Sequence, residues 1–305
     1  MKHLNLGPKQ SPTSYRKIAI SSWNHPRDPS TYSWIDLPTG PMEAFLEGFA
    51  GEEARPTITH FVAKIIAHTL QKNPELDHVL RNGSLYRRPT TDLYITTLLK
   101  GKGSLDLSGF TLRDIPSKSL VKLAVESGVL VEHLRKGEDA ETERTKQVTL
   151  GLPTWLLRPL IGLQDWCHFT LNVSLKAFGI PDDRFGSAVI TNFGPLGLEN
   201  GLVPLSPYCR CPMMIGLGKA RKIPVVEGET IVARECVTIS FTFDHRYADG
   251  AHGAQMMRLF QKLFLDPARY AHVFEGAASP GDSARLPAKR SFLPAKGVQK
   301  RNEPY

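Results

Sequence analysis

The sequence predicts an α/β fold, in which helices pack on a sheet. Residues 57–73 show the apolar periodicity of an amphipathic helix, whereas V-T-I-S-F-T-F at 237–243 alternates as a half-buried strand does. Hydrophobic residues make up 41% and charged residues 22% of the 305 residues, an ordinary globular composition that excludes a wholly disordered chain. This length allows one or two domains, and we expect one domain at 29–274.

The first part of the chain is expected to form an arm, a strand and a helix. Residues 1–28 predict an N-terminal arm, and alternating aromatic and β-branched residues predict a strand at 31–38. The helix at 57–73 is predicted to end at Pro74. Its apolar face is formed by Phe61, Val62, Ile65, Ile66 and Leu70. On the opposite face we expect His60, Lys64 and His68.

The histidines and cysteines do not indicate a metal site. His60 and His68 lie eight residues apart, two steps of four along one helix face, but they lack the H-E-x-x-H pattern of a metal pair. Four cysteines are too few for a disulfide framework, and none has the spacing of a zinc site. They are Cys167, Cys209, Cys211 and Cys236. We therefore expect a reduced, cytoplasmic protein without a bound metal.

The middle of the chain predicts two short strands and a second helix. The strands are expected near 84–88 and 92–98, and G-K-G-S at 101–104 is interpreted as a turn because it lacks the glycine spacing of a phosphate loop. The helix is predicted at 117–135, with Ser117 or Ser119 as its N-cap. The charged residues 135–146 then predict an exposed loop or a fraying helix end.

Residues 152–178 are unusually rich in Leu and aromatic residues. Pro159 is expected to break this stretch into two helical pieces. We interpret it as a core or subunit-contact helix. A membrane-surface helix is the alternative, but its polar face would lack the usual Lys and Arg.

The last part of the chain predicts three strands and a helix. The strands are expected at 185–192, 212–218 and 230–243, and the helix at 251–265, before Pro267. Residues 275–305 predict a disordered basic tail, because 279–305 hold six basic and two acidic residues in a Pro-rich context.

Charge and hydropathy limit the partners. The net charge is +8, and a basic end could dock an acidic partner, although a solvated tail is the simpler interpretation. No nucleic-acid-binding motif accompanies the charge, so we expect no nucleic acid. The longest stretch without Asp, Glu, Lys or Arg is the 14 residues 185–198. Since a spanning helix needs about 18 or more apolar residues, we expect no membrane span, and MKHLNLGPKQ predicts no signal peptide.

The junction between the last strand and the last helix has the sequence F-T-F-D-H-R-Y-A-D-G-A. A short loop between two rigid elements is a common place for a catalytic group. Here it offers one titratable base, His245, flanked by Asp244 and Arg246. Asp249 can cap the following helix, and Gly250 permits a tight turn.

D-H-R-Y-A-D-G at 244–250 resembles the D-H-R-x-x-D-G signature of the 2-oxoacid dehydrogenase acyltransferases, and H-x-x-x-D-G is shared with the related chloramphenicol acetyltransferase fold. Further segments resemble the family in the same order, so the match covers about 16–272. They are T-H-F-V-A-K-I-I-A-H-T-L-Q-K-N-P-E-L, L-R-D-I-P-S-K-S-L-V-K-L-A-V-E, F-G-S-A-V-I-T-N-F-G-P-L-G and P-M-M-I-G-L-G-K. The resemblance implies a chloramphenicol acetyltransferase-like α/β fold, a mixed sheet with packed helices.

The resemblance also implies a mechanism. His245 would be the general base that takes a proton from a thiol attacking an acyl thioester, with coenzyme A or acyl-CoA as substrate. Ordinary pKa values of about 6.5 for His and 8.5 for a thiol make full transfer uphill by about 2.7 kcal/mol, which one His can supply. In the family a Ser hydroxyl stabilises the oxyanion, and the matching residue here is Thr191. One such donor contributes roughly 2.7–4 kcal/mol.

The other residues of the signature would support the loop. The resemblance implies that Asp249 positions it by capping and a salt bridge without moving protons, and that Asp244, Arg246 and Gly250 are structural. In related enzymes the His and the hydroxyl come from neighbouring subunits, so we expect a homotrimer or larger homo-oligomer. The family motif does not identify residues that bind coenzyme A.

The family's multienzyme subunits carry a lipoyl domain and a peripheral-subunit-binding domain ahead of the core. Only about 28 residues precede the first predicted strand, so we expect a stand-alone enzyme. A lipoyl group would then be supplied by a lipoyl-bearing protein in trans, or the acceptor is different. The alternatives are a non-catalytic assembly subunit, a small-molecule O- or N-acetyltransferase, and membrane or nucleic-acid association through the basic ends.

Overall fold

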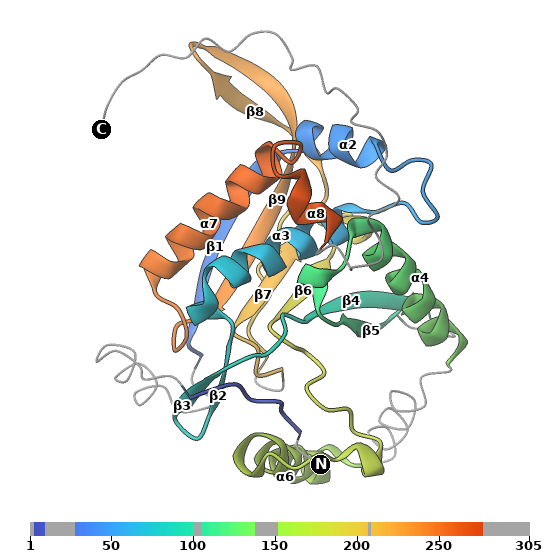
Figure 1. The fold of residues 1–305 in the computed structure, drawn as a ribbon, viewed down its shortest axis with the longest axis vertical. Helices are drawn as coiled ribbons and strands as arrows, with labels where there is room; N and C mark the ends of the chain where they lie inside the picture. The colour runs from blue at the N-terminus through green and yellow to red at the C-terminus, as the bar shows by residue number, and fades with distance from the viewer. Residues whose placement is uncertain (1–2, 10–27, 101–104, 138–151, 207–208, 277–305) are drawn as a thin grey trace.

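A mixed sheet of seven strands forms the centre of the molecule, and helices cover one of its faces (Figure 1). The computed structural model describes residues 3–9, 28–100, 105–137, 152–206 and 209–276. The strand order is β1-β9-β7-β6-β4-β5, and β8 pairs with β9. β6 runs parallel to both β4 and β7, whereas the other neighbours are antiparallel. The predicted α/β fold with a mixed sheet and packed helices is confirmed.

The strands confirm the predicted positions and add three more. The sheet consists of β1 (Ser30–Pro38), β4 (Leu93–Lys100), β5 (Leu105–Leu112), β6 (Ala188–Asn192), β7 (Met213–Leu217), β8 (Arg221–Glu227) and β9 (Thr230–Asp244). A separate hairpin contains β2 (His78–Arg81) and β3 (Ser84–Arg87). We did not predict β2, β5 and β8. β5 contains Gly109, which weakens the strand pattern, and β8 contains Pro224, which a strand tolerates only at an edge.

The predicted helices are also present. The α-helices are α2 (Gly40–Glu47), α3 (Ile58–Lys72), α4 (Leu120–Lys136), α6 (Thr154–Asp165), α7 (Gly250–Leu265) and α8 (Ala271–Glu275). Short turns of helix are η1 (Pro74–Leu76), η2 (Ile115–Ser117), η3 (Trp166–Leu171), η4 (Lys176–Phe178) and η5 (Gly194–Leu196). Ser119 is the N-cap of α4 and accepts from the Lys122 backbone N–H, which decides between the two predicted caps. The short α2 was not predicted.

The main core lies between the sheet and α3. The Phe61 ring of α3 stacks on Phe274 of α8, with ring centroids 4.8 Å apart, and meets Phe264 of α7 edge-on. Alternate strand residues complete this core, among them Ile190 of β6 and Ile239 of β9. The residues between them point to the other face, so the two faces of the sheet have different surroundings.

Lys64 lies inside this helical layer, although it was predicted on the helix face opposite the apolar residues. Its side chain is 2% exposed. The aliphatic stem is buried along α3, and Nζ donates hydrogen bonds to the carbonyl oxygens of Ile115 at 3.0 Å and Pro116 at 2.9 Å. The η2 turn therefore closes over a polar residue that helical periodicity alone assigns to the surface. His60 lies at the start of α3, where its Nδ1 accepts from the Thr57 backbone N–H.

The predicted break at Pro159 is wrong. α6 continues past this residue to Asp165, with Pro159 inside the helix. The helix instead changes at Trp166, where η3 is a π-helical turn. The core interpretation of this stretch is also wrong for several large side chains. Those with more than 40% of their surface exposed are Trp155, Leu160, Ile161, Leu163, Trp166, Leu171, Val173 and Phe178. The subunit-contact interpretation stays a prediction.

Several predictions fall outside the described residues. These are most of the N-terminal arm (10–27), the turn at 101–104, the charged loop at 138–146 and the tail at 277–305. Of the arm, residues 3–9 are described, and they lie against the β2–β3 hairpin and the end of η3. Among the described helices, none has both the length and the apolar composition needed to cross a bilayer.

Candidate active site

The loop from β9 to α7 carries the D-H-R-Y-A-D-G signature and is held by an internal ion pair. Asp244, 3% exposed, accepts hydrogen bonds from the Arg246 backbone N–H at 2.9 Å and from Arg246 Nη2 at 2.6 Å. Buried carboxylates need such partners because desolvation is costly. The two residues that flank His245 are therefore locked to one another, which restricts the conformations of the residue between them.

The backbone of His245 is fixed by the rest of the sheet. Its N–H donates to the Pro29 carbonyl oxygen at 2.9 Å, and the Asp244 N–H donates to the Pro212 carbonyl oxygen at 2.9 Å. The side chain of His245 is half-buried at the end of β9. A histidine held in this way has a defined position next to solvent, as a general base requires.

Tyr247 anchors the loop to β2, a role that the sequence did not indicate. Its hydroxyl accepts a hydrogen bond from the Leu80 backbone N–H of β2 at 2.8 Å. The ring is 3% exposed and packs with Leu80 and Leu85. Burial raises the pKa of the phenol well above its ordinary value, so the hydroxyl stays protonated. Because 167 residues separate the two partners, no local sequence pattern could have revealed the contact.

Asp249 is the N-cap of α7. Its Oδ1 accepts from the backbone N–H groups of Ala251 and His252, each at 3.1 Å, and lies 2.5 Å from His252 Nδ1. The cap fixes the point at which the loop enters the helix. Gly250 is exposed with open space at its Cβ position, so within one chain the tight turn does not require a glycine there.

Thr191 lies on β6, on the face of the sheet that the main helical layer does not cover. Its Oγ1 accepts a hydrogen bond from the Thr96 hydroxyl of β4 at 3.1 Å. On the neighbouring strand it pairs with Gly216, where a Cβ would come within 2.4 Å of Ser240 Oγ. The close packing here therefore depends on the absence of a side chain at 216. Thr191 is partly exposed, and its own proton can be donated to a further group.

The sheet register keeps His245 and Thr191 apart within one chain. Thr191 pairs with Gly216, and Gly216 pairs with Ser240 of β9, so these residues form one row across the sheet. His245 follows Ser240 by five positions, which is about 17 Å along the strand, and the row itself spans two strand spacings, or about 10 Å. The two predicted catalytic groups therefore do not meet in one chain.

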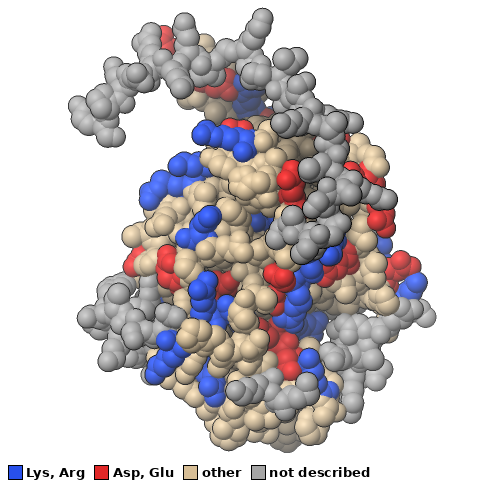
Figure 2. Space-filling model, viewed as in Figure 1, with Lys and Arg blue, Asp and Glu red and all other residues tan. Residues whose placement is uncertain are grey.

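Charged residues on the molecular surface do not form a single-sign stripe on the face that Figure 2 shows. Lys and Arg alternate there with Asp and Glu among the described residues. A continuous basic strip is the usual footprint of a nucleic-acid partner. This face therefore does not add support to nucleic-acid binding.

The fold is that of the acyltransferase cores of 2-oxoacid dehydrogenase complexes. The cubic core of the pyruvate dehydrogenase multienzyme complex covers 80% of this chain with a TM-score of 0.59 at 17% identity, and the chain covers 85% of that structure. The structure of Azotobacter vinelandii dihydrolipoamide acetyltransferase covers 87% of this chain with a TM-score of 0.60 at 17% identity, and the chain covers 99% of that structure.

Sequence comparison finds similarity to one acyltransferase family. Residues 179–271, which include Thr191 and His245, match the model of the 2-oxoacid dehydrogenases acyltransferase (catalytic domain) family. A Bacillus subtilis (strain 168) protein named as the dihydrolipoyllysine-residue acetyltransferase component of the acetoin cleaving system is 25% identical over 70% of this chain. The dihydrolipoyllysine-residue acetyltransferase component of the pyruvate dehydrogenase complex of Rhizobium meliloti (strain 1021) is 27% identical over 70% of this chain. The chain spans only 42% and 46% of these two relatives. The predicted family resemblance is confirmed.

Proposed function

We propose that the chain is a CoA-dependent acyltransferase in which His245 is the general base for a thiol acceptor. The observation that carries the proposal is the His245 loop, which matches the family signature and is held by the Asp244–Arg246 pair, the Tyr247–Leu80 hydrogen bond and the Asp249 cap. These contacts restrict the conformation of the loop, which supports the proposal because proton transfer requires a well-positioned imidazole.

In the proposed reaction the acceptor sulfur attacks the carbonyl carbon of an acyl-CoA thioester while His245 takes the thiol proton. The tetrahedral intermediate carries a negative oxygen. When its bond to the CoA sulfur breaks, the proton passes from His245 to that sulfur, and the acyl group remains on the acceptor. Thr191 would donate its hydroxyl proton to the oxyanion, an arrangement supported by the hydrogen bond that its oxygen already accepts from Thr96.

The proposed site is completed by a second copy of the chain. The register separation of His245 and Thr191 supports a site shared between neighbouring chains, because a reacting carbonyl must lie about 3 Å from both groups. A homotrimer or larger homo-oligomer supplies such a pairing. The mixed-sheet fold shared with multienzyme cores supports the same conclusion.

The acceptor is proposed to be a dihydrolipoyl group carried by another chain, or a different thiol. The test measures acyl transfer from acetyl-CoA and other acyl-CoA donors to dihydrolipoamide, to a separate lipoyl domain, and to a panel of small thiols, alcohols and amines. His245→Ala should abolish turnover with the preferred pair, whereas His133→Ala, on the exposed side of α4, should leave it unchanged. Turnover that survives His245→Ala would refute the assigned base.

A non-catalytic assembly subunit is the second candidate, and the exposed apolar side chains of α6 favour it. A surface that presents Trp155, Ile161 and Leu163 to solvent is suited to contact between chains. If wild type and His245→Ala are equally inactive with every acceptor yet assemble equally well, this second function replaces the first.

A further inference from the structure

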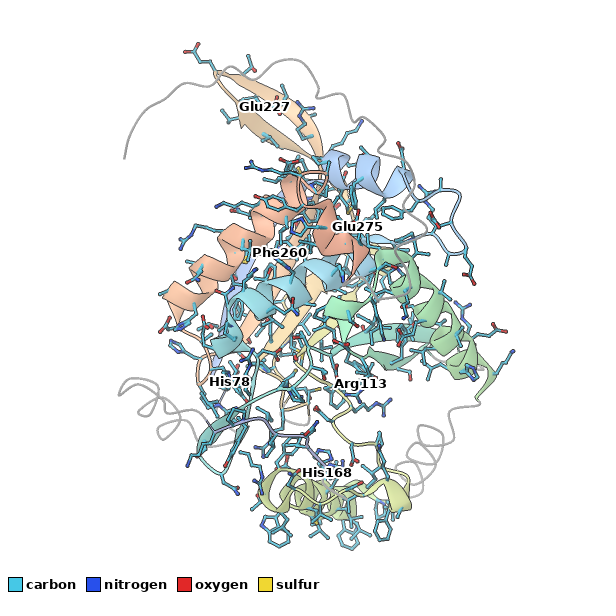
Figure 3. All side chains as sticks on the ribbon, viewed as in Figure 1. His78, Arg113, His168, Glu227, Phe260 and Glu275 are labelled. Atoms are coloured by element: carbon cyan, nitrogen blue, oxygen red, sulfur yellow. The ribbon has the colours of Figure 1, made fainter. Side chains whose placement is uncertain are left out.

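A cluster of His3, His168 and Asp182 lies outside the His245 loop. It joins the N-terminal segment 3–9, the π-helical turn η3 and the segment that precedes β6. His168 lies at the end of the molecule opposite Glu227 of β8 (Figure 3). The proposed acyl transfer does not use any of these three side chains.

The cluster is buried and closely packed. His168 is 3% and His3 5% exposed, and their imidazole rings stack with centroids 3.4 Å apart and an interplanar angle of 8°. Asp182 Oδ1 lies 3.2 Å from His3 Nδ1, and Ser174 Oγ donates to the other carboxylate oxygen at 2.8 Å. One nitrogen of each histidine and one carboxylate oxygen all lie within 4.8 Å of one another.

The two histidines carry buried nitrogens that the protein leaves without a partner. Nε2 of His3 and Nε2 of His168 are inaccessible to solvent and have no hydrogen-bond partner among the described residues. Such groups are rare in folded proteins and call for a physical explanation. Burial lowers the pKa of His168 to about 4 and also lowers that of His3. Both rings are therefore neutral near pH 7, which is the form that binds metal ions.

We propose that His3, His168 and Asp182 bind a divalent transition-metal ion of the zinc type. Two imidazoles and one carboxylate are a ligand set that suits zinc, whereas magnesium and calcium prefer oxygen ligands throughout. Three protein ligands leave a fourth position for water.

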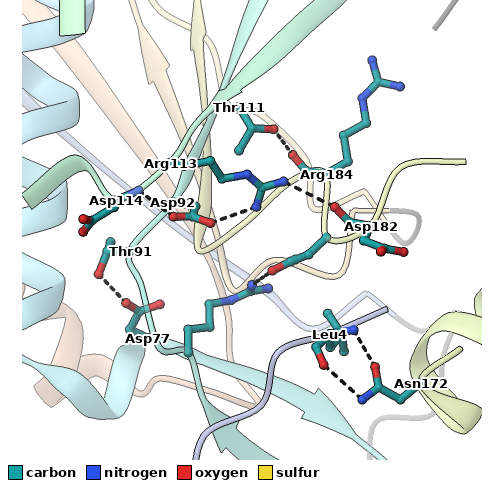
Figure 4. Close-up of polar contacts among 12 residues, drawn as sticks. Leu4, Asp77, Thr91, Asp92, Thr111, Arg113, Asp114, Asn172, Asp182 and Arg184 are labelled. Carbon is teal, nitrogen blue, oxygen red and sulfur yellow. Dashed lines mark hydrogen bonds and ion pairs between the residues drawn. The ribbon is translucent and has the colours of Figure 1, made fainter. Parts of the chain in front are cut away.

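The surroundings hold the backbone of the site in advance. The Asn172 side chain accepts from the Leu4 N–H at 2.5 Å and donates to the Leu4 carbonyl at 3.1 Å, and the His3 N–H donates to the Asn172 carbonyl at 3.2 Å. Figure 4 shows this clamp on Leu4, with Asp182 nearby. Metal binding then needs only side-chain movement. Two parallel rings cannot both point a lone pair at one ion, so one imidazole must turn about its Cβ–Cγ bond, and the ligand atoms must draw together to distances of about 2 Å from the metal.

The neighbouring positive charges are paired with carboxylates or can move away from the site. Arg88 is buried close by, but its guanidinium is paired with Asp183 and also faces Asp77. Lys176 Nζ lies 3.6 Å from Asp182 Oδ2 and is half-exposed, so it can move into solvent when a metal ion binds this carboxylate. The ion would connect residue 3 to residues 168 and 182 and so tie the N-terminal segment to the domain.

The experiment uses the full, untagged chain after treatment with a chelator. Calorimetric titration with ZnCl₂ should show one tight site per chain, Co²⁺ should give the visible absorption of a low-coordinate site, and Zn²⁺ should raise the melting temperature. His3→Gln and Asp182→Asn should each weaken zinc binding at least about tenfold. The matched control is His133→Gln on exposed α4, which should bind as wild type does.

Two outcomes would overturn the proposal: wild type that binds no zinc at micromolar concentrations, or His3→Gln and Asp182→Asn variants that bind it as wild type does. His168→Asn removes the most buried ligand, and circular dichroism reports whether that variant folds. His3→Gln and Asp182→Asn give a decision even if His168→Asn is unfolded. The acyl-transfer assay is not needed for either result, so failure of this proposal is distinct from failure of the proposed function.

Discussion

A site shared between chains predicts that two inactive variants restore activity when they are mixed. His245→Ala removes the proposed base, and Thr191→Val removes the hydroxyl while keeping the branched shape of the side chain. The sheet register places these two residues about 17 Å apart along the strands and about 10 Å across them within one chain. Each active site must then combine His245 of one chain with Thr191 of the next.

The expected recovery follows from random assembly. In a closed ring built from equal amounts of the two variants, a site is intact when its histidine comes from the Thr191→Val chain and its threonine from the His245→Ala chain. This combination occurs in about one quarter of sites, whatever the ring size. Thr191→Val alone should be about 10²- to 10³-fold less active than wild type, because it lacks one oxyanion donor. His245→Ala alone should be inactive.

The assay measures initial rates of acyl transfer after the two variants are unfolded together and refolded at equal concentration. Wild type mixed with the double variant is the control, because shared sites again give about one quarter of the wild-type rate, whereas sites within one chain give about one half. No recovery from the two single variants, together with one half in the control, would refute the shared site.

Three further predictions concern the loop and the core. Tyr247→Phe leaves the buried Leu80 N–H without its acceptor and should lower the free energy of unfolding by about 1–3 kcal/mol; amide exchange at Leu80 that is no faster than in wild type would contradict this. Asp249→Ala removes the α7 cap and should cost about 0.5–2 kcal/mol, measured as a lower urea midpoint, and an unchanged midpoint would count against the cap. Burial lowers the pKa of Lys64 from 10.5 to about 8, so between these pH values the unfolded chain binds the proton that the folded chain has lost. The free energy of unfolding of wild type should therefore rise relative to Lys64→Met by up to about 1.4 kcal/mol per pH unit in this window, and parallel stability curves for the two proteins would show that Lys64 is not buried in this way.

The sequence predicted those elements whose side-chain pattern repeats with the period of the backbone. α3 and β9 were found within one or two residues, because each buries one face and therefore repeats apolar residues every 3.6 or every two positions. The loop after β9 was found for a similar reason, since a strand end, a charged triplet and a capping aspartate are all local signals.

Elements that depend on distant packing were not predicted. Lys64 was placed on the face opposite the apolar residues, and the sequence does not show that the Ile115 and Pro116 carbonyls accept its hydrogen bonds. Conversely, the apolar residues of α6 suggested burial, yet many of them are exposed in the single chain. Composition reports how readily a side chain would be buried, and only the neighbouring elements decide whether it is.

The sequence by itself determined the type of fold, the family and the local form of the loop around His245, since short-range periodicity and motif spacing carry that information. Only the tertiary structure showed that Tyr247 contacts Leu80 and that His3 contacts His168. It also showed that the strand register keeps Thr191 away from His245. These facts depend on strand register and on contacts between residues far apart in the chain, and a side-chain pattern within one segment does not encode either of them.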